Sequence, residues 1–201
     1  MFSWRISGMK DLFLFIIFRV FIFLVEILPD KMKYYLGKGF GKFAYKLTAD
    51  RRELAQKNLS IVFKDKLSEE EINQITERVY ENVGLMLVEF IMLRKIDKSN
   101  FRNYVEIENK KHLEEAYNKG QGVIIYGAHF GNWEWMASFI SLLGFPLNAI
   151  AQKQHNEYFD NYINDIRENK GVNVIPLGVS IREAYSALKK GECVFVLGDQ
   201  D

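Results

Sequence analysis

The residues best suited to chemistry lie between positions 127 and 135, in the sequence GAHFGNWEW. His129 follows a short apolar run, and Glu134 lies five positions later, in the first turn of an expected helix. A carboxylate beside an imidazole can hold one ring N–H while the other ring nitrogen takes a proton, as a general base does. Gly131 lets the backbone bend closely around a ligand, and a helix beginning at Asn132 offers N–H groups to an anion. We therefore take His129 and Glu134 as candidate catalytic residues, and Gly131 and Asn132 as candidate substrate-binding residues.

Other catalytic patterns are missing from the sequence. The string nearest to a G-x-S-x-G nucleophile elbow, at residues 178–182, lacks its second glycine. Cys193 lies inside an apolar run, which indicates an inert core thiol. No third side chain has a spacing suited to a metal site with His129, so a metal is not expected. The predicted chemistry also needs no other cofactor. The pattern favours direct attack by a substrate hydroxyl that His129 deprotonates, with a purely structural histidine as the alternative.

The elements around this turn follow an alternating order. Short apolar runs predict strands, the segments between them predict helices, and such alternation is typical of an α/β fold with a largely parallel sheet. The expected strands are 122–127, 146–151, 172–177 and 193–197, and the expected helices are 132–143, 155–169 and 180–190. Ligands of such sheets bind beyond the carboxyl ends of the strands, where His129 falls.

The N-terminal half predicts helices instead. Ser68 and Glu71 form a capping box that opens a long amphipathic helix, with an expected buried stripe that includes Val79 and Val83. Residues 31–47 form a basic amphipathic segment in which lysines recur every four positions. These lysines (Lys38, Lys42 and Lys46) are expected either to lie on anionic lipid headgroups or to form an ordinary solvated face.

Charge and hydropathy both indicate a membrane partner for the N-terminal end. The 201-residue chain has a net charge of +1 and 48% hydrophobic residues, which excludes a disordered protein. Residues 1–60 carry eleven basic and five acidic side chains, a net charge of +6, which predicts an anionic membrane surface as a partner. Residues 12–28 are apolar except for Arg19 and Glu26. This run predicts a marginal transmembrane helix or a deep interfacial anchor, with a buried core helix as the alternative.

The sequence HFGNWE, after the strand GVIIYGA, closely resembles the H-x4-(D/E) box of the lipid A biosynthesis acyltransferases, a family of the lysophospholipid acyltransferase superfamily. The resemblance extends to RRELAQKNLSIVF (51–63) and to Glu89. The segment NYINDIRENK provides Arg167 as the matching arginine. The last residues, LKKGECVFVLGDQD, provide Asp199 and Asp201 as the two matching acids.

This resemblance implies a membrane-bound O-acyltransferase that moves a fatty acyl chain from acyl carrier protein to a hydroxyl of a lipid A precursor. His129 would be the general base and Glu134 its orienting partner. Arg167, Asp199 and Asp201 would join Gly131 and Asn132 in binding substrate, with a helix-surface salt bridge as the alternative for Arg167. Another glycolipid or phospholipid acceptor, or a non-catalytic lipid-binding module, stays open as an alternative function. A nucleic-acid partner is not expected.

The resemblance also implies an organisation and a location. Residues 1–30 would be a single N-terminal anchor in the inner membrane, and residues 31–201 an acyltransferase domain on its cytoplasmic face. Members of the family continue well beyond the strand that ends in the two acids. We therefore expect the α/β domain of this chain to be C-terminally incomplete.

Overall fold

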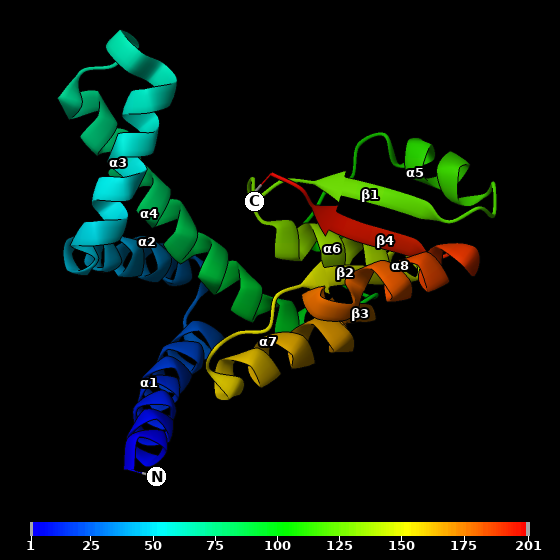
Figure 1. Ribbon diagram of the computed structural model, residues 1–201, viewed down its shortest axis with the longest axis horizontal. Coiled ribbons are helices and arrows are strands. Elements are labelled where there is room, and N and C mark those ends of the chain that lie inside the picture. Colours follow the sequence, from blue (N-terminus) through cyan, green and yellow to red (C-terminus); the bar gives the residue numbers. More distant parts are fainter. Residues whose placement is uncertain (1, 200–201) are drawn as a thin grey trace. The chain divides into compact units, whose positions relative to one another are not determined.

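The computed structural model describes residues 2–199, and the chain divides into two compact units. One unit contains the residues up to Val20 and those from Leu93 onward, and the other contains Phe21–Met92. Helix α1 (Phe2–Ile27) contributes its first part to one unit and its last turns to the other. Figure 1 shows the order of the elements along the chain.

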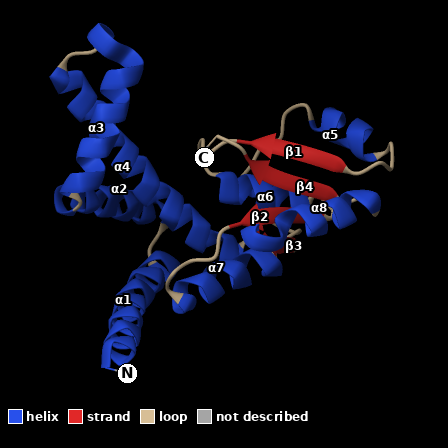
Figure 2. Cartoon of the chain, viewed as in Figure 1, coloured by secondary structure: helices blue, strands red, loops and turns tan. Residues whose placement is uncertain are grey.

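The first unit contains a four-stranded sheet in which every neighbouring pair is parallel. The strands stand in the order β1-β4-β2-β3, and Figure 2 shows helices packed around them. Their bounds are β1 (Val123–Gly127), β2 (Leu147–Ala151), β3 (Val172–Pro176) and β4 (Cys193–Leu197). The expected α/β class and parallel sheet are confirmed, and each strand agrees with its expected range to within one residue.

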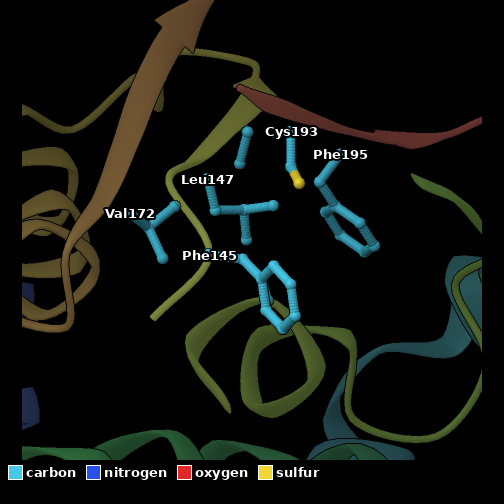
Figure 3. Packing of buried hydrophobic residues seen from close by; sticks show 7 residues of the cluster. Phe145, Leu147, Val172, Cys193 and Phe195 are labelled. Carbon is cyan, nitrogen blue, oxygen red and sulfur yellow. The ribbon is translucent and has the colours of Figure 1, made fainter. Parts of the chain in front are cut away.

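The helices of this unit alternate with the strands. They are α5 (Lys110–Tyr117), α6 (Trp133–Leu142), α7 (Glu157–Asn169) and α8 (Ser180–Lys189), with short 3-10 turns at Leu93–Lys95 (η2), Phe101–Asn103 (η3) and Leu177–Val179 (η4). Figure 3 shows the core beside the sheet, where Phe145 and Leu147 meet Val172, Cys193 and Phe195. Cys193 is fully buried there, as its apolar strand predicts.

The strand order determines which chain segments meet at the site. Gly127, the last residue of β1, pairs with Leu197, the last residue of β4. The two segments stay together beyond these strands, because the Gly198 N–H donates to the Gly127 carbonyl at 3.2 Å and the Tyr126 hydroxyl donates to the Gly198 carbonyl at 2.8 Å. Residues that follow β1 and β4 are therefore neighbours, although about 70 positions separate them in the sequence.

The first part of α1 packs against α7 through aromatic rings. The Phe15 ring stacks on Tyr158, with centroids 5.5 Å apart, and the Phe18 ring lies 4.9 Å from that of Phe159. The amide of Asn156, which caps α7, donates to the Asp11 carbonyl at 3.1 Å. Other large apolar side chains of this part of α1 are exposed, namely Leu12, Phe13, Leu14, Ile16, Ile17 and Val20. Among residues 2–199 we find no helix with the length and apolar character needed to cross a membrane.

The second unit is helical and contains α2 (Asp30–Leu47), α3 (Ala49–Phe63), the 3-10 turn η1 (Lys64–Lys66) and α4 (Glu69–Met92). The capping box at the start of α4 is confirmed, since Ser68 N–H donates to a Glu71 carboxylate oxygen at 2.8 Å. The backbones of α2 and α4 come very close, because Gly37 and Gly41 of α2 face Gly84 of α4. A side chain at Gly41 or Gly84 would clash with backbone atoms of the facing helix and prevent that approach.

The α2–α4 contact changes two sequence expectations. The lysine stripe of α2 meets acidic residues of α4, since Lys42 and Lys38 both lie 3.1 Å from carboxylate oxygens of Glu81. Hydrogen bonds from Lys42 and then Lys38 hold the pKa of Glu81 below its usual range. The expected buried stripe of α4 is wrong at Val79 and Val83, whose side chains are exposed. The small residue Gly84 is buried instead, which an apolar pattern does not reveal.

Candidate active site

The turn between β1 and α6 has a tightly determined backbone. The Phe130 N–H donates to the Ala128 carbonyl at 2.7 Å, and Gly131 then adopts a left-handed conformation with φ +62°. Glycine takes that conformation at little cost. Asn132 caps α6, because its side-chain oxygen accepts the Trp135 N–H at 3.1 Å. Gly131 and Asn132, which we expected to bind substrate, thus have clear roles in shaping the turn that presents His129.

The carboxylate of Asp199 contacts the imidazole of His129. Its Oδ1 is 2.9 Å from Nδ1, and the His129 backbone N–H donates to both carboxylate oxygens, at 3.1 and 3.0 Å. The two residues follow β1 and β4, so the parallel pairing of those strands brings them together. Both side chains are about one-third exposed, which leaves the pair within reach of a substrate.

The charge of the Asp199 carboxylate is stabilised by its hydrogen bonds with His129. The hydrogen bond from the His129 side chain is the main cause that lowers the pKa of Asp199 below its ordinary value, with a smaller contribution from the His129 N–H. An ionised Asp199 carboxylate accepts a hydrogen bond from a protonated Nδ1. In the neutral imidazole that carries its proton on Nδ1, Nε2 is the nitrogen that can take a proton. The Trp133 ring meets the imidazole nearly edge-on, with centroids 4.7 Å apart. This arrangement suits a general base.

Glu134 makes a different contact from the one we expected. We expected its carboxylate to orient His129, but its two oxygens accept hydrogen bonds from Arg167, at 2.9 Å from Nε and 2.5 Å from Nη2. The third guanidinium nitrogen donates to Asn164 at 3.2 Å. The Glu134 and Arg167 side chains are only 16% and 17% exposed, so the ion pair is largely shielded from water. This ion pair joins the first turn of α6 to the last turn of α7. The carboxylate that contacts the His129 imidazole is that of Asp199.

Asp201, the second acid expected at the site, lies outside the described residues. Within residues 2–199 no three histidine, cysteine or acidic side chains lie together as a metal site would require. Sequence reasoning missed Trp133 as a contact of His129 and Asn164 as a contact of Arg167. The signal for Asn164 was helical spacing, since it lies three residues before Arg167 on α7.

Comparison with known proteins identifies the family of this chain. A sequence model described as bacterial lipid A biosynthesis acyltransferase matches residues 2–201, which is nearly the whole chain. This chain belongs to that family. The family expected from HFGNWE and its flanking segments is thereby confirmed.

Curated members of the family are similar to most of this chain. A lipid A biosynthesis palmitoleoyltransferase of Escherichia coli (strain K12) is 29% identical over 178 residues, which are 87% of this chain and 56% of that protein. A lipid A biosynthesis lauroyltransferase of the same strain is 26% identical over 182 residues, which are 90% of this chain and 58% of that protein. A lipid A biosynthesis acyltransferase of Shigella flexneri is 29% identical. The chain thus spans just over half the length of these lipid A acyltransferases.

Proposed function

We propose that this protein transfers a fatty acyl chain from acyl carrier protein to a hydroxyl group of a lipid A precursor. The observation that carries the proposal is the His129–Asp199 pair, in which Nδ1 and Oδ1 lie 2.9 Å apart at the carboxyl ends of two adjacent parallel strands. The printed names of the curated relatives support lipid A as the acceptor. The acyl carrier protein donor rests on the family resemblance alone.

In the proposed mechanism, His129 acts as the general base. Asp199 holds the proton on Nδ1, and Nε2 takes the proton from the acceptor hydroxyl as its oxygen attacks the thioester carbonyl. The tetrahedral intermediate collapses to an ester as the C–S bond breaks, and the imidazolium returns the proton to the leaving thiolate. The enzyme ends in its starting state, without a covalent acyl-enzyme.

Negative charge develops on the carbonyl oxygen during this attack. The first turn of α6 lies beside the imidazole, as the Trp133 ring contact shows, and the N–H groups at a helix N-terminus favour such charge. Gly131 and Asn132 hold this turn in position, so we assign their contribution to its backbone. Substrate binding by Asp201 stays a prediction from the family resemblance.

We assign Glu134 and Arg167 to positioning. Their paired hydrogen bonds connect the helix that follows His129 to α7, and the same guanidinium also binds Asn164. All three side-chain nitrogens of Arg167 therefore already donate hydrogen bonds. Direct binding of an acceptor phosphate by Arg167 would compete with these contacts, whereas a role in ordering the turn uses them.

We further propose that α1 attaches the protein to the inner membrane, with the acyltransferase domain on the cytoplasmic face. The exposed apolar side chains of α1, among them Phe13, Ile16 and Ile17, support the attachment, because burying each in a lipid surface would be favourable. The aromatic contacts of Phe15 and Phe18 with α7 would then bring the lipid surface to the catalytic unit. The cytoplasmic orientation rests on the family resemblance.

The test is acyl transfer in detergent or reconstituted membranes. Purified protein is incubated with lauroyl-, myristoyl- or palmitoleoyl-acyl carrier protein and with a panel of acceptors: a lipid A precursor, another glycolipid and a phospholipid. We expect acylated lipid A precursor as the main product, and a 10²–10⁴-fold lower rate for His129→Ala. The control His112→Ala alters an exposed histidine of α5 and should keep the parental rate.

The same experiment separates the alternatives. Free fatty acid in excess of acylated lipid would identify a hydrolase and contradict acyl transfer. Transfer to a different acceptor would keep the chemistry and change the substrate. Lipid binding that survives both His129→Ala and Glu134→Ala, without transfer by the parental protein, would identify a non-catalytic lipid-binding module.

A further inference from the structure

A polar cavity lies in the same unit as the candidate active site, and it has no part in the mechanism above. Its volume is about 450 Å³, within the range of small-ligand sites. Its polar lining comes from three elements: Arg19 of α1, Arg94 of η2, and Asp165, Asn169 and Lys170 of α7 and its C-terminal end. It therefore contains three cationic side chains and one carboxylate.

Lys170 is the most buried of these charges. The residue is 8% exposed, and burial lowers the pKa of its ammonium group, with Asp97 acting in the opposite direction. Within residues 2–199 the ammonium group donates one hydrogen bond, to the Ile96 carbonyl at 2.6 Å. An ammonium group has three N–H donors, so donors remain for a ligand. A bound anion would offset the cost of burying this charge.

Contacts with the Tyr162 ring of α7 place both Arg19 and Arg94 beside the cavity. Arg19 follows Phe18, whose ring lies 5.6 Å from that of Tyr162, and this contact holds the arginine-bearing turn of α1 against α7. The Arg94 guanidinium lies 5.8 Å from the centre of the same Tyr162 ring. Both arginines therefore converge on one side of α7, where Tyr162 also lines the cavity.

The cavity is separate from the Glu134–Arg167 pair. Its α7 residues (Tyr162, Asp165, Ile166 and Asn169) recur at i, i+3, i+4 and i+7, which places them on one helical face. Arg167 is not among the residues that line it, and its guanidinium binds Glu134 on α6. A ligand held by Lys170 and the two arginines would leave the Glu134–Arg167 contact intact.

From this arrangement we propose that the cavity lined by Arg19, Arg94 and Lys170 is a binding subsite for a phosphomonoester group. With Asp165 counted, the four charged side chains carry a formal net charge of +2. A phosphomonoester carries about −1.5 to −2 at neutral pH and three strongly accepting oxygens, whereas a phosphodiester carries only one negative charge. Guanidinium groups bind such oxygens in pairs, and the Asn169 amide adds a neutral donor. The proposal does not depend on acyl transfer.

The test measures binding of defined phosphates to the full chain in neutral detergent by isothermal titration calorimetry. The probes are inorganic phosphate, dihexanoyl phosphatidic acid as a lipid phosphomonoester, and dihexanoyl phosphatidylglycerol as the matched phosphodiester. We expect phosphatidic acid to bind at least about tenfold more tightly than phosphatidylglycerol. Tighter binding of phosphatidic acid than of inorganic phosphate would assign the subsite to a lipid headgroup, and the reverse order to a free phosphate.

Single substitutions locate the binding. Arg19→Gln and Arg94→Gln should each weaken phosphomonoester binding about tenfold or more, and Asp165→Asn should strengthen it by removing the opposing carboxylate. The matched control Arg182→Gln removes the same charge from an exposed position on α8, outside this cavity, and should leave affinity unchanged.

Equal binding of monoester and diester, or equal losses for Arg182→Gln and Arg19→Gln, would overturn the proposal in favour of non-specific charge attraction. Absence of binding by both phosphomonoester probes would overturn it as well. Since Arg19 is exposed, its substitution should leave folding intact, and circular dichroism of each variant checks this point. None of these outcomes affects the proposed acyl transfer, which is measured separately through His129.

Discussion

Glycines at the α2–α4 contact provide the sharpest test of the helical unit, because neighbouring glycines of one helix should respond to alanine in opposite directions. A Cβ atom at Gly41 would lie 2.7 Å from the Glu81 Cα and closer still to the Tyr80 carbonyl oxygen. A Cβ atom at Gly39, two positions earlier in α2, would meet nothing within 4 Å. The two substitutions Gly41→Ala and Gly39→Ala thus add the same methyl group to the same helix in different surroundings.

The magnitudes follow from these contacts. Carbon atoms pack best at about 3.5–4.0 Å, so Gly41→Ala requires α2 and α4 to separate by about 1 Å. The atoms that it meets belong to the backbone of α4 and cannot rotate away. Overpacking of this kind costs about 1–3 kcal/mol, and we expect the upper end here. Gly39→Ala should instead stabilise the protein by about 0.5–1 kcal/mol, since alanine loses less conformational freedom in a helix.

The assay is urea unfolding of the full chain followed by circular dichroism, with the free energy of unfolding taken from the transition. We expect Gly41→Ala to unfold at clearly lower urea concentration than the parent, and Gly39→Ala at equal or higher concentration. Gly84→Ala should behave like Gly41→Ala, because its Cβ atom would lie 2.8 Å from the Gly41 nitrogen. Equal stability of the Gly41→Ala and Gly39→Ala variants would refute the close backbone contact.

Three other properties can be measured with the same protein. Glu134→Gln should lower the free energy of unfolding by about 1.5–3 kcal/mol, because it weakens the paired, shielded hydrogen bonds to Arg167, while Glu157→Gln in an exposed ion pair should leave the urea transition unchanged. The two lysine partners lower the pKa of Glu81, so its ion pairs should contribute to stability in full above about pH 4.3 and lose that contribution as the pH falls further. The thermal unfolding temperatures of the parent and of Glu81→Gln should therefore converge in acid. A constant difference between them down to about pH 2 would contradict this expectation. Burial raises the pKa of the Cys193 thiol, so a thiol reagent should modify it only as fast as the protein unfolds, and rapid labelling of the native protein would argue against its buried position.

Local patterns were sufficient to predict the elements of the sheet unit. The alternation of apolar runs and helical segments predicts all four strands, because a strand buried in a parallel sheet is apolar along its length. The position of His129 at the end of the first strand follows directly from that alternation. The capping box at Ser68 is equally local, and the structure contains its hydrogen bonds.

The same local patterns could not predict contacts between segments that are distant in the sequence. The strand order β1-β4-β2-β3 places Asp199 beside His129, and no local signal distinguishes this order from one in which β1 lies next to β2. Glu134 is near His129 in sequence and was therefore the expected partner. Its carboxylate binds Arg167, 33 positions away, because the first turn of α6 meets the last turn of α7. Side-chain direction at a helix start depends on such tertiary contacts and not on spacing alone.

Apolar periodicity also failed to predict the buried face of α4, where glycines determine the helix packing. In α4 the pattern favours a buried stripe through Val79 and Val83, but α2 approaches along the line of Gly84. A helix contact made by glycines buries backbone atoms, which hydropathy does not measure. The lysine stripe of α2 had an equally non-local partner, since it pairs with Glu81 on α4.

We propose that His129 and Asp199 act as one unit in acyl transfer, and a double-mutant comparison of rates tests this coupling. Single-turnover rate constants are measured for the parent, His129→Gln, Asp199→Asn and the double variant. If the carboxylate works only through the imidazole, Asp199→Asn should slow the parent strongly but slow the His129→Gln protein no further. Losses that multiply in the double variant, or an Asp199→Asn protein as fast as the parent, would contradict the claim.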